Sequence, residues 1–371
     1  MKTKKISKKR ISISVISLLM ALLMVCLAGC NKDGKDNSSS SSSGGIVITP
    51  DDSSDTSSED NAPKLEIPTR TDKVKSAKDA NKDVVGWLYI PGLSGVDHGV
   101  CHDASSYSYD RRDINGKKLG GIGSGKEYWV YGAYYTHLRN TFGDDESAMS
   151  TNTVIFGHSD LGITNKNYKD DDPEGPLFSQ LFRFRDPSFA EKTPYIYFST
   201  PTKTLVYEVF SVFYNDAKID GGKALWYIEP EPGVDYGTLL DTVKERSLYK
   251  YNVDVTTSDK ILTLSTCTVG FGLQKRGNYR FVIVAKLVSD TSDLRVKNAS
   301  FTINADAPIP STFEKTFKDY VANWKPSTEV VAADPGSAIE SSAASSSVLT
   351  GFGSTHSMPQ RAMRGEYCAM S

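Results

Sequence analysis

The chain has 371 residues, of which 39% are hydrophobic and 24% are charged, and its formal net charge is -2. This composition is ordinary for one medium-sized globular domain with extra segments. The near-neutral charge balance excludes the strongly basic surface that identifies most nucleic-acid-binding proteins.

The N-terminus has the pattern of an export signal. Basic residues between positions 2 and 10 precede the apolar stretch 11–28, which ends in Leu27-Ala28-Gly29-Cys30. This ending resembles the lipobox of a bacterial lipoprotein signal peptide, which implies cleavage after residue 29 and attachment of a lipid to Cys30. The alternative is an uncleaved membrane anchor, since about eighteen apolar residues can just span a bilayer. Either way, we expect the chain to be tethered at the extracellular face of the cytoplasmic membrane.

Cysteine usage predicts at least one free thiol. Cys26 lies in the leader, and Cys30 would carry the lipid. Cys101, Cys267 and Cys368 remain, and three thiols cannot all pair. An unpaired thiol in an exported protein is a candidate reactive group, and Cys267 has the best sequence context for that role.

Composition divides the rest of the chain into four parts. Residues 30–68 are rich in Ser, Asp and Gly, which predicts a disordered linker. A folded domain is expected over 69–290, beginning with a short helix at 71–81. Residues 291–325 would form a C-terminal extension with a docking helix, and 326–371 is predicted to be a disordered tail.

Eight short apolar or alternating segments predict strands within the folded domain. Because few long helices separate them, the pattern favours a closed eight-stranded β-barrel with peripheral helices over an alternating βαβ sheet. Between the sixth and seventh strands, Asp235 is predicted to cap an amphipathic helix that ends at Arg246. The predicted strands are 86–90, 96–101, 128–135, 153–157, 195–199, 204–214, 260–267 and 278–287.

The last two predicted strands place a cysteine beside an arginine. Alternation in the first strand puts the odd-numbered residues from Ile261 to Cys267 on one face, so the thiol ends a rigid element just before a glycine-bearing loop. If the two strands pair antiparallel, Arg280 at the start of the second comes near Cys267.

His158 directly follows the strand predicted at 153–157. Histidine exchanges protons near neutral pH, and a position just past a strand end exposes the ring while the backbone stays fixed. A lone histidine in such a place is more often a surface or capping group, but Cys267 and Arg280 at neighbouring strand ends favour a functional role. Together the three could carry acyl transfer, in which a thiol attacks a carbonyl, the histidine protonates the departing amine and a cation holds the oxyanion.

At these residues the chain resembles the sortases, which are cysteine transpeptidases of Gram-positive cell surfaces. Their Thr-Leu-x-Thr-Cys strand end is matched by residues 263–267, and an arginine opens the next strand. The stretch 81–92 and the helix at 235–246 are similar to features of class B. The resemblance implies the sortase barrel for the folded domain.

The same resemblance implies roles for three residues and requires no metal or organic cofactor. Cys267 would be the nucleophile, His158 the general acid/base, and Arg280 the ligand of the oxyanion or the substrate carbonyl. The enzyme would cleave a Pro-x-Thr-type C-terminal sorting signal after Thr through a thioester. It would then transfer the surface protein to an amine of peptidoglycan or its lipid-linked precursor.

Two alternatives stay open beside this interpretation. A sortase-like cysteine peptidase or a pilin-joining enzyme would differ only in the second acceptor. A non-catalytic surface-binding lipoprotein on a sortase barrel would lack the chemistry altogether.

Several residues depart from the family pattern or compete with the assigned ones. Class B members often carry an acidic residue two positions after the cysteine, where this chain has Val269, so no carboxylate is assigned to orient the histidine. Arg276 is a second candidate for the role given to Arg280. The acidic residues between 170 and 174 predict a solvated loop.

Overall fold

The computed structural model describes most of the chain between residues 62 and 325. The predicted signal peptide with Cys30, the first part of the linker and the tail 326–371 lie outside the described residues, as does Arg276. None of the helices in the described ranges is long and apolar enough to cross a membrane. The described residues are 62–119, 132–159, 171–216, 226–270, 279–310, 313, 317, 318 and 325.

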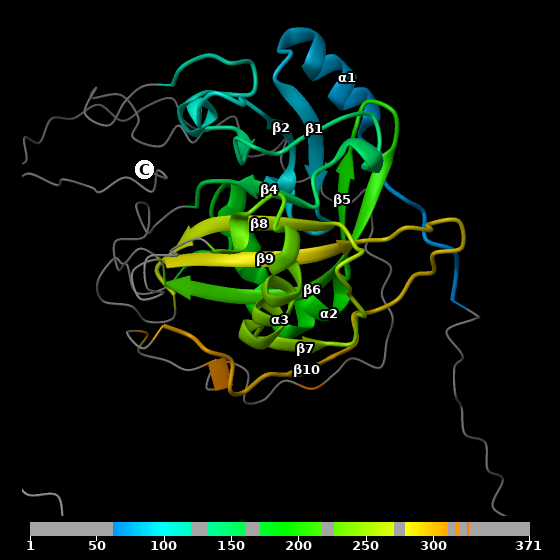
Figure 1. The fold of residues 1–371 in the computed structure, drawn as a ribbon, viewed down its shortest axis with the longest axis vertical. Coiled ribbons are helices and arrows are strands. Elements are labelled where there is room, and N and C mark those ends of the chain that lie inside the picture. The colour runs from blue at the N-terminus through cyan, green and yellow to red at the C-terminus, as the bar shows by residue number, and fades with distance from the viewer. Residues whose placement is uncertain are drawn as a thin grey trace, which may run out of the picture. The chain divides into compact units, whose positions relative to one another are not determined.

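Eight strands close into a barrel in the order β1-β2-β3-β4-β8-β9-β6-β5 (Figure 1). Neighbouring strands are antiparallel except for two parallel pairs, β2 with β3 and β4 with β8. The closed eight-stranded barrel predicted from the sequence is therefore confirmed. The strands are β1 (Val84–Tyr89), β2 (Asp97–Cys101), β3 (Tyr134–Thr136), β4 (Asn152–Phe156), β5 (Tyr195–Ser199), β6 (Thr204–Asp216), β8 (Ile261–Thr268) and β9 (Tyr279–Leu287).

Within the described residues, three α-helices and several 3-10 turns connect the strands. Two of the three helices expected from the sequence are confirmed as α1 (Thr71–Ala80) and α3 (Tyr236–Arg246), and α2 (Pro187–Lys192) is an addition. Most of the stretch predicted to form the docking helix, 311–325, lies outside the described residues. The predicted capping role of Asp235 is wrong, because its side chain makes no capping hydrogen bond and the chain enters α3 from a preceding 3-10 turn. The 3-10 turns are η2 (Ser94–Val96), η3 (Ser108–Arg111), η4 (Glu146–Ala148), η5 (Leu177–Arg185), η6 (Trp226–Ile228) and η7 (Gly233–Asp235).

Alternation along β8 separates the barrel interior from its outer face. Leu262 and Leu264 belong to the main core, whereas Ile261 packs with the apolar stripe of α3. The Oγ of Ser265 lies 3.0 Å from the hydroxyl of Tyr227, which comes from η6. Because α3 and η6 cover this outer face, the odd-numbered residues through Cys267 are buried although they point away from the barrel interior.

The predicted linker ends earlier than expected, because its last residues are held on the barrel. The amide of Leu65 donates to the carbonyl of Leu294 (2.7 Å), and Leu65 and Ile67 pack against Tyr89 and Tyr197. Burying these two apolar side chains offsets the entropy lost by ordering the segment.

A second, two-stranded sheet lies beside the barrel. It pairs β7 (Tyr249–Tyr251) antiparallel with β10 (Phe301–Ile303), which belongs to the C-terminal extension. Both strands have only three residues, which is too short for the period-two pattern to identify them. The extension therefore contributes a strand that was not predicted.

Candidate active site

Cys267 and Arg280 are directly paired across two antiparallel strands. Cys267 lies in β8 and Arg280 near the start of β9, and they face each other in the register of the pair. Side chains on directly opposed residues carry Cβ atoms about 4.5–5.5 Å apart. The two residues are 9% and 7% exposed, so the arginine is a fixed, nearly buried cation beside the sulfur. The predicted meeting of these two strand ends is confirmed.

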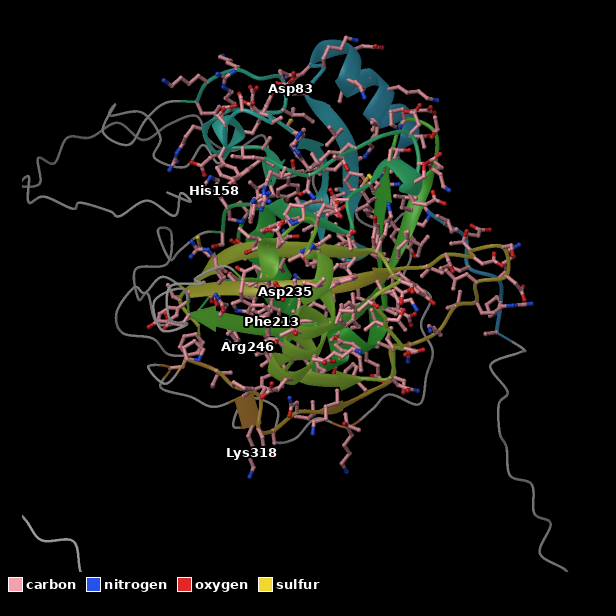
Figure 2. The ribbon with its side chains drawn as sticks, in the orientation of Figure 1. Asp83, His158, Phe213, Asp235, Arg246 and Lys318 are labelled. Atoms are coloured by element: carbon pink, nitrogen blue, oxygen red, sulfur yellow. The ribbon has the colours of Figure 1, made fainter. Side chains whose placement is uncertain are left out.

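His158 is held beside the end of β8 by the residues on either side of it. The Gly157 amide donates to the carbonyl of Ser265 (3.3 Å), and the Ser159 hydroxyl donates to the carbonyl of Cys267 (2.5 Å). These bonds continue the parallel pairing of β4 with β8, so the register places His158 alongside Cys267. Figure 2 shows His158 near the end of β4, and in Figure 1 β8 ends and β9 starts on the same side of the barrel.

Gly157 is required by the close packing that holds this turn. A Cβ on Gly157 would lie 2.6 Å from the ring of Phe178 and 2.8 Å from the ring of Tyr134. Any larger residue would push the chain away from β8 and move His158 with it. The glycine before the histidine therefore fixes the position of the ring as well as the turn.

Asp110 is a partner of His158 that the sequence did not reveal. The Nε2 atom of His158 lies 2.8 Å from Oδ1 of Asp110 and 2.9 Å from the Asp110 carbonyl oxygen. Both partners are acceptors, so Nε2 carries a proton and donates it. The two side chains are 14% and 11% exposed, which limits competition from water. Asp110 is thus the orienting carboxylate that was left unassigned.

The surroundings of Asp110 keep it ionised. Burial alone would raise the pKa of this carboxyl, but the hydrogen bond and charge of His158, aided by Arg111 and Tyr135, lower it overall. Nε of Arg111 is 3.2 Å from Oδ2, and the Tyr135 hydroxyl donates to Oδ1 over 3.5 Å. The pair therefore contributes stability that is present above the unfolded carboxyl pKa of about 3.9 and lost as pH falls through the lower folded pKa.

Arg280 lies in a largely buried aromatic setting. Its Nη1 donates to the carbonyl of Tyr279 (3.0 Å). Burial raises the pKa of Tyr227 to about 12, and the positive charge of Arg280 opposes that rise. Burial likewise raises the pKa of Tyr135, again with Arg280 opposing it. The two phenols are neutral at physiological pH, so neither contributes a negative charge beside Arg280.

The prediction of at least one free thiol is confirmed by Cys101 within the described residues. Cys101 is fully buried, and burial raises the pKa of its thiol, which makes it a poor nucleophile. A nucleophilic role for Cys267 requires its reduced sulfur.

Asp171 corrects the prediction of a solvated acidic loop. Its side chain is 1% exposed, and its Oδ1 accepts the amide of Val269 (2.8 Å). Its Oδ2 accepts the hydroxyl of Thr268 (2.5 Å) and lies 3.8 Å from Nη1 of the buried Arg185. Burial of this carboxylate is tolerated because a cation and two donors surround it. Asp171 therefore fixes the backbone at residues 268 and 269, next to Cys267.

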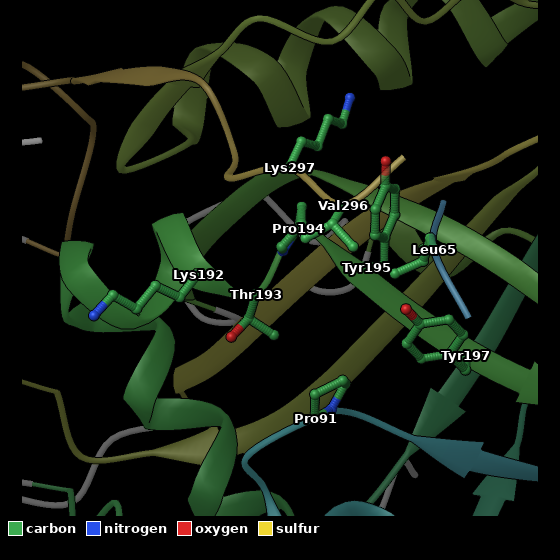
Figure 3. Close-up of a pocket in the computed structure, with 9 residues that line it drawn as sticks. All are labelled: Leu65, Pro91, Lys192, Thr193, Pro194, Tyr195, Tyr197, Val296 and Lys297. Carbon is green, nitrogen blue, oxygen red and sulfur yellow. The ribbon is translucent and has the colours of Figure 1, made fainter. Parts of the chain in front are cut away.

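Other parts of the surface offer no comparable site. Within the described ranges, no group of three His, Cys, Asp or Glu residues could hold a metal ion. A small pocket lies beside β5, which is opposite β4 in the closed strand order (Figure 3). Its lining includes Lys192, Tyr195 and Lys297, and Nζ of Lys297 is 2.6 Å from Glu208. No cysteine or histidine is among the residues that line this pocket.

Comparisons with known proteins find sortases among the proteins similar to this chain. A family model described as the sortase domain matches residues 130–288. The chain is 27% identical over 220 residues to Sortase B of Listeria monocytogenes, covering 59% of this chain and 75% of that protein. It is 26% identical over 216 residues to Sortase B of Staphylococcus aureus, covering 58% and 74%. A solved Clostridium perfringens sortase B matches with 24% identity and a TM-score of 0.45, covering 58% of this chain and 99% of that one.

Proposed function

We propose that this protein anchors surface proteins to the cell wall. The chain carries a sortase domain and is a homologue of Sortase B, and it is therefore a sortase-type cysteine transpeptidase. Its substrates would be proteins with a Pro-x-Thr-type C-terminal sorting signal. Its acceptor would be an amine of peptidoglycan or of the lipid-linked precursor. The enzyme would act outside the cell, held by a lipid on Cys30 or by its N-terminal apolar stretch.

The observation that carries the proposal is the convergence of three strand ends. The paired register of Cys267 with Arg280 and the anchored turn around His158 bring a thiol, a cation and an acid/base to one end of the barrel. Acyl transfer needs these three groups within reach of one carbonyl.

The proposed reaction has two acyl-transfer steps. In the first, the reduced sulfur of Cys267 bonds to the threonine carbonyl carbon while Arg280 stabilises the oxyanion. The C–N bond then breaks, and His158 gives a proton to the departing amine, which leaves a thioester. In the second step the acceptor amine attacks the thioester, His158 takes its proton, and the sulfur leaves. With Nε2 protonated toward Asp110, the exchanged proton is carried by Nδ1.

Product analysis tests the second step of this function. The full-length protein is incubated under reducing conditions with a sorting peptide, with and without an amine-bearing peptidoglycan peptide, and products are identified by mass spectrometry. We expect the threonine end of the peptide to become joined to the amine. Hydrolysis alone in the presence of amine would identify a peptidase instead. No cleavage across a panel of Pro-x-Thr-type peptides would favour a binding protein.

Replacing Asp110 by asparagine is expected to lower kcat by about 10²-fold, which is the lower end of what a positioned acid/base contributes. The amide is uncharged, so it accepts the hydrogen bond from Nε2 of His158 more weakly than the carboxylate does and holds the ring less firmly. The measurement is the pH profile of kcat/KM for the variant and the wild type.

The matched control for Asp110 is Asp103→Asn. Asp103 lies in the same connection, but its carboxylate accepts from Ser105, Ser106 and Ser108. This control should keep the wild-type pH profile. An Asp110→Asn profile that overlays the wild type would show that the carboxylate has no influence on His158.

A further inference from the structure

The C-terminal extension continues past the sortase domain and is fastened to the barrel. The family match ends at residue 288, and the described chain then runs on through β10. The Ala299 amide donates to the carbonyl of Glu191 (2.7 Å), and the Asn304 amide donates to that of Leu248 (2.9 Å). In Figure 1 the extension, in orange, passes β7 toward the side of the view where β8 and β6 end. The chain is therefore led to the active-site end.

Phe313 of this extension packs beside the two strands that carry the site. Its ring lies 5.1 Å from that of Tyr214 in β6 and 5.3 Å from that of Tyr279 in β9, both in edge-to-face geometry. The Phe313 ring thus packs on Tyr279, the residue before Arg280. Tyr279 is in turn paired with Thr268, the residue after Cys267.

Phe313 also covers Gly270, the second residue after β8. Gly270 has a positive φ of 71°, and a Cβ there would lie 2.2 Å from the Phe313 ring. The ring can approach the backbone this closely only because the residue is glycine. Phe313 itself is 9% exposed and belongs to the main core cluster.

The backbone that leaves the nucleophile is therefore held from two sides. The carboxylate of Asp171 holds the amide of Val269, and the ring of Phe313 covers Gly270. Removing the ring would leave a space beside Gly270 and weaken one of these two restraints. The segment 268–270 would then open more often, since local opening follows local packing.

We propose that the C-terminal extension completes the active site, with Phe313 as a positioning residue that fixes segment 268–270 and through it the geometry of Cys267 and Arg280. The test of this inference by kcat/KM rests on the proposed function, whereas its test by hydrogen exchange does not. In this role Phe313 acts through the backbone.

The same extension supplies a matched control for testing this role. Phe317 is 2% exposed, and its ring lies 5.4 Å from that of Tyr249 in β7, away from the paired site residues. Phe313→Ala and Phe317→Ala each remove one buried phenyl ring from the same segment. Both variants are expected to unfold at a lower temperature than the wild type. An unfolding temperature alone therefore cannot distinguish the role of Phe313 from that of Phe317.

Two measurements made well below both unfolding temperatures separate the positions. Phe313→Ala should lower kcat/KM for a sorting peptide at least 10-fold relative to Phe317→Ala. Hydrogen exchange at the amides of 268–270 should be faster in Phe313→Ala only. Phe313→Tyr, which keeps the ring, should restore both values, and Phe313→Leu serves if the alanine variant does not fold.

Equal kcat/KM and equal exchange in the two alanine variants would overturn the positioning role. If no variant and no wild-type protein cleaves any peptide, the proposed function fails by itself. In that case the exchange comparison still decides whether Phe313 holds the segment.

Discussion

Replacing Cys267 by alanine is expected to reduce cleavage of a sorting peptide to background, a loss of at least about 10³-fold. The reaction forms a bond from the carbonyl carbon to sulfur, and no neighbouring side chain can replace that atom. His158 and Arg280 remain in place, so peptide binding should persist while turnover disappears. Steady-state rates under reducing conditions measure the loss, and intact-protein mass spectrometry should detect a peptide adduct on the wild type but not on the variant.

The matched control for this experiment is Cys101→Ala. Cys101 is a fully buried thiol in β2, and its role is packing. Removing it should leave the adduct and the rate per folded molecule unchanged. Persistence of the adduct in Cys267→Ala, or its loss in Cys101→Ala, would place the nucleophile elsewhere.

Replacing Arg280 by lysine is expected to lower kcat by about 10²–10³-fold, the range for removing one oxyanion donor. Lysine keeps the positive charge, but it loses the planar fork of donors and the fixed geometry of a guanidinium. An interaction made only with the oxyanion lowers kcat and leaves KM unchanged, whereas one with the substrate carbonyl also raises KM. Separate determination of kcat and KM therefore shows which oxygen the arginine binds.

Lys286→Ala on the same strand is the control for the loss of a cation from β9. Nζ of Lys286 lies 3.6 Å from Oδ1 of Asp259 and donates to the carbonyl of Asp254. It is six positions beyond Arg280, so its removal should leave both constants unchanged. A wild-type kcat in Arg280→Lys would exclude a geometric role for the guanidinium and leave only its charge.

The strands that carry the site were predictable because the residue pattern that identifies them lies within each strand. In β8 and β9, apolar and β-branched residues recur over eight or nine positions, and a short connection makes antiparallel pairing the simple solution. The pairing of Cys267 with Arg280 follows from that register. Assigning His158 needed the family resemblance as well, since a single histidine after a strand carries little information.

The partners of these residues were not predictable, because they come from distant segments with no periodicity. Asp110 lies in a short 3-10 turn, 48 residues before the histidine it contacts. Asp171 lies in an acidic run, where the default expectation is solvation, and its burial depends on Arg185 and the Val269 amide. Compensation of a buried charge depends on three-dimensional neighbours and leaves no sequence signal. The signal peptide, the lipid on Cys30 and the extracellular location stay predictions.

The parallel pairing of β4 with β8 has a consequence for how activity is acquired during folding. His158 and Cys267 are 109 residues apart in the chain, and β5 and β6 lie between them in sequence, so pairing β4 with β8 closes a long loop. Contacts at such separation form late and slowly, because the loop-closure entropy is lost before the contact compensates for it. Partly folded chains therefore lack the assembled acid/base and nucleophile pair. A chain whose barrel has not yet closed therefore cannot act on neighbouring proteins.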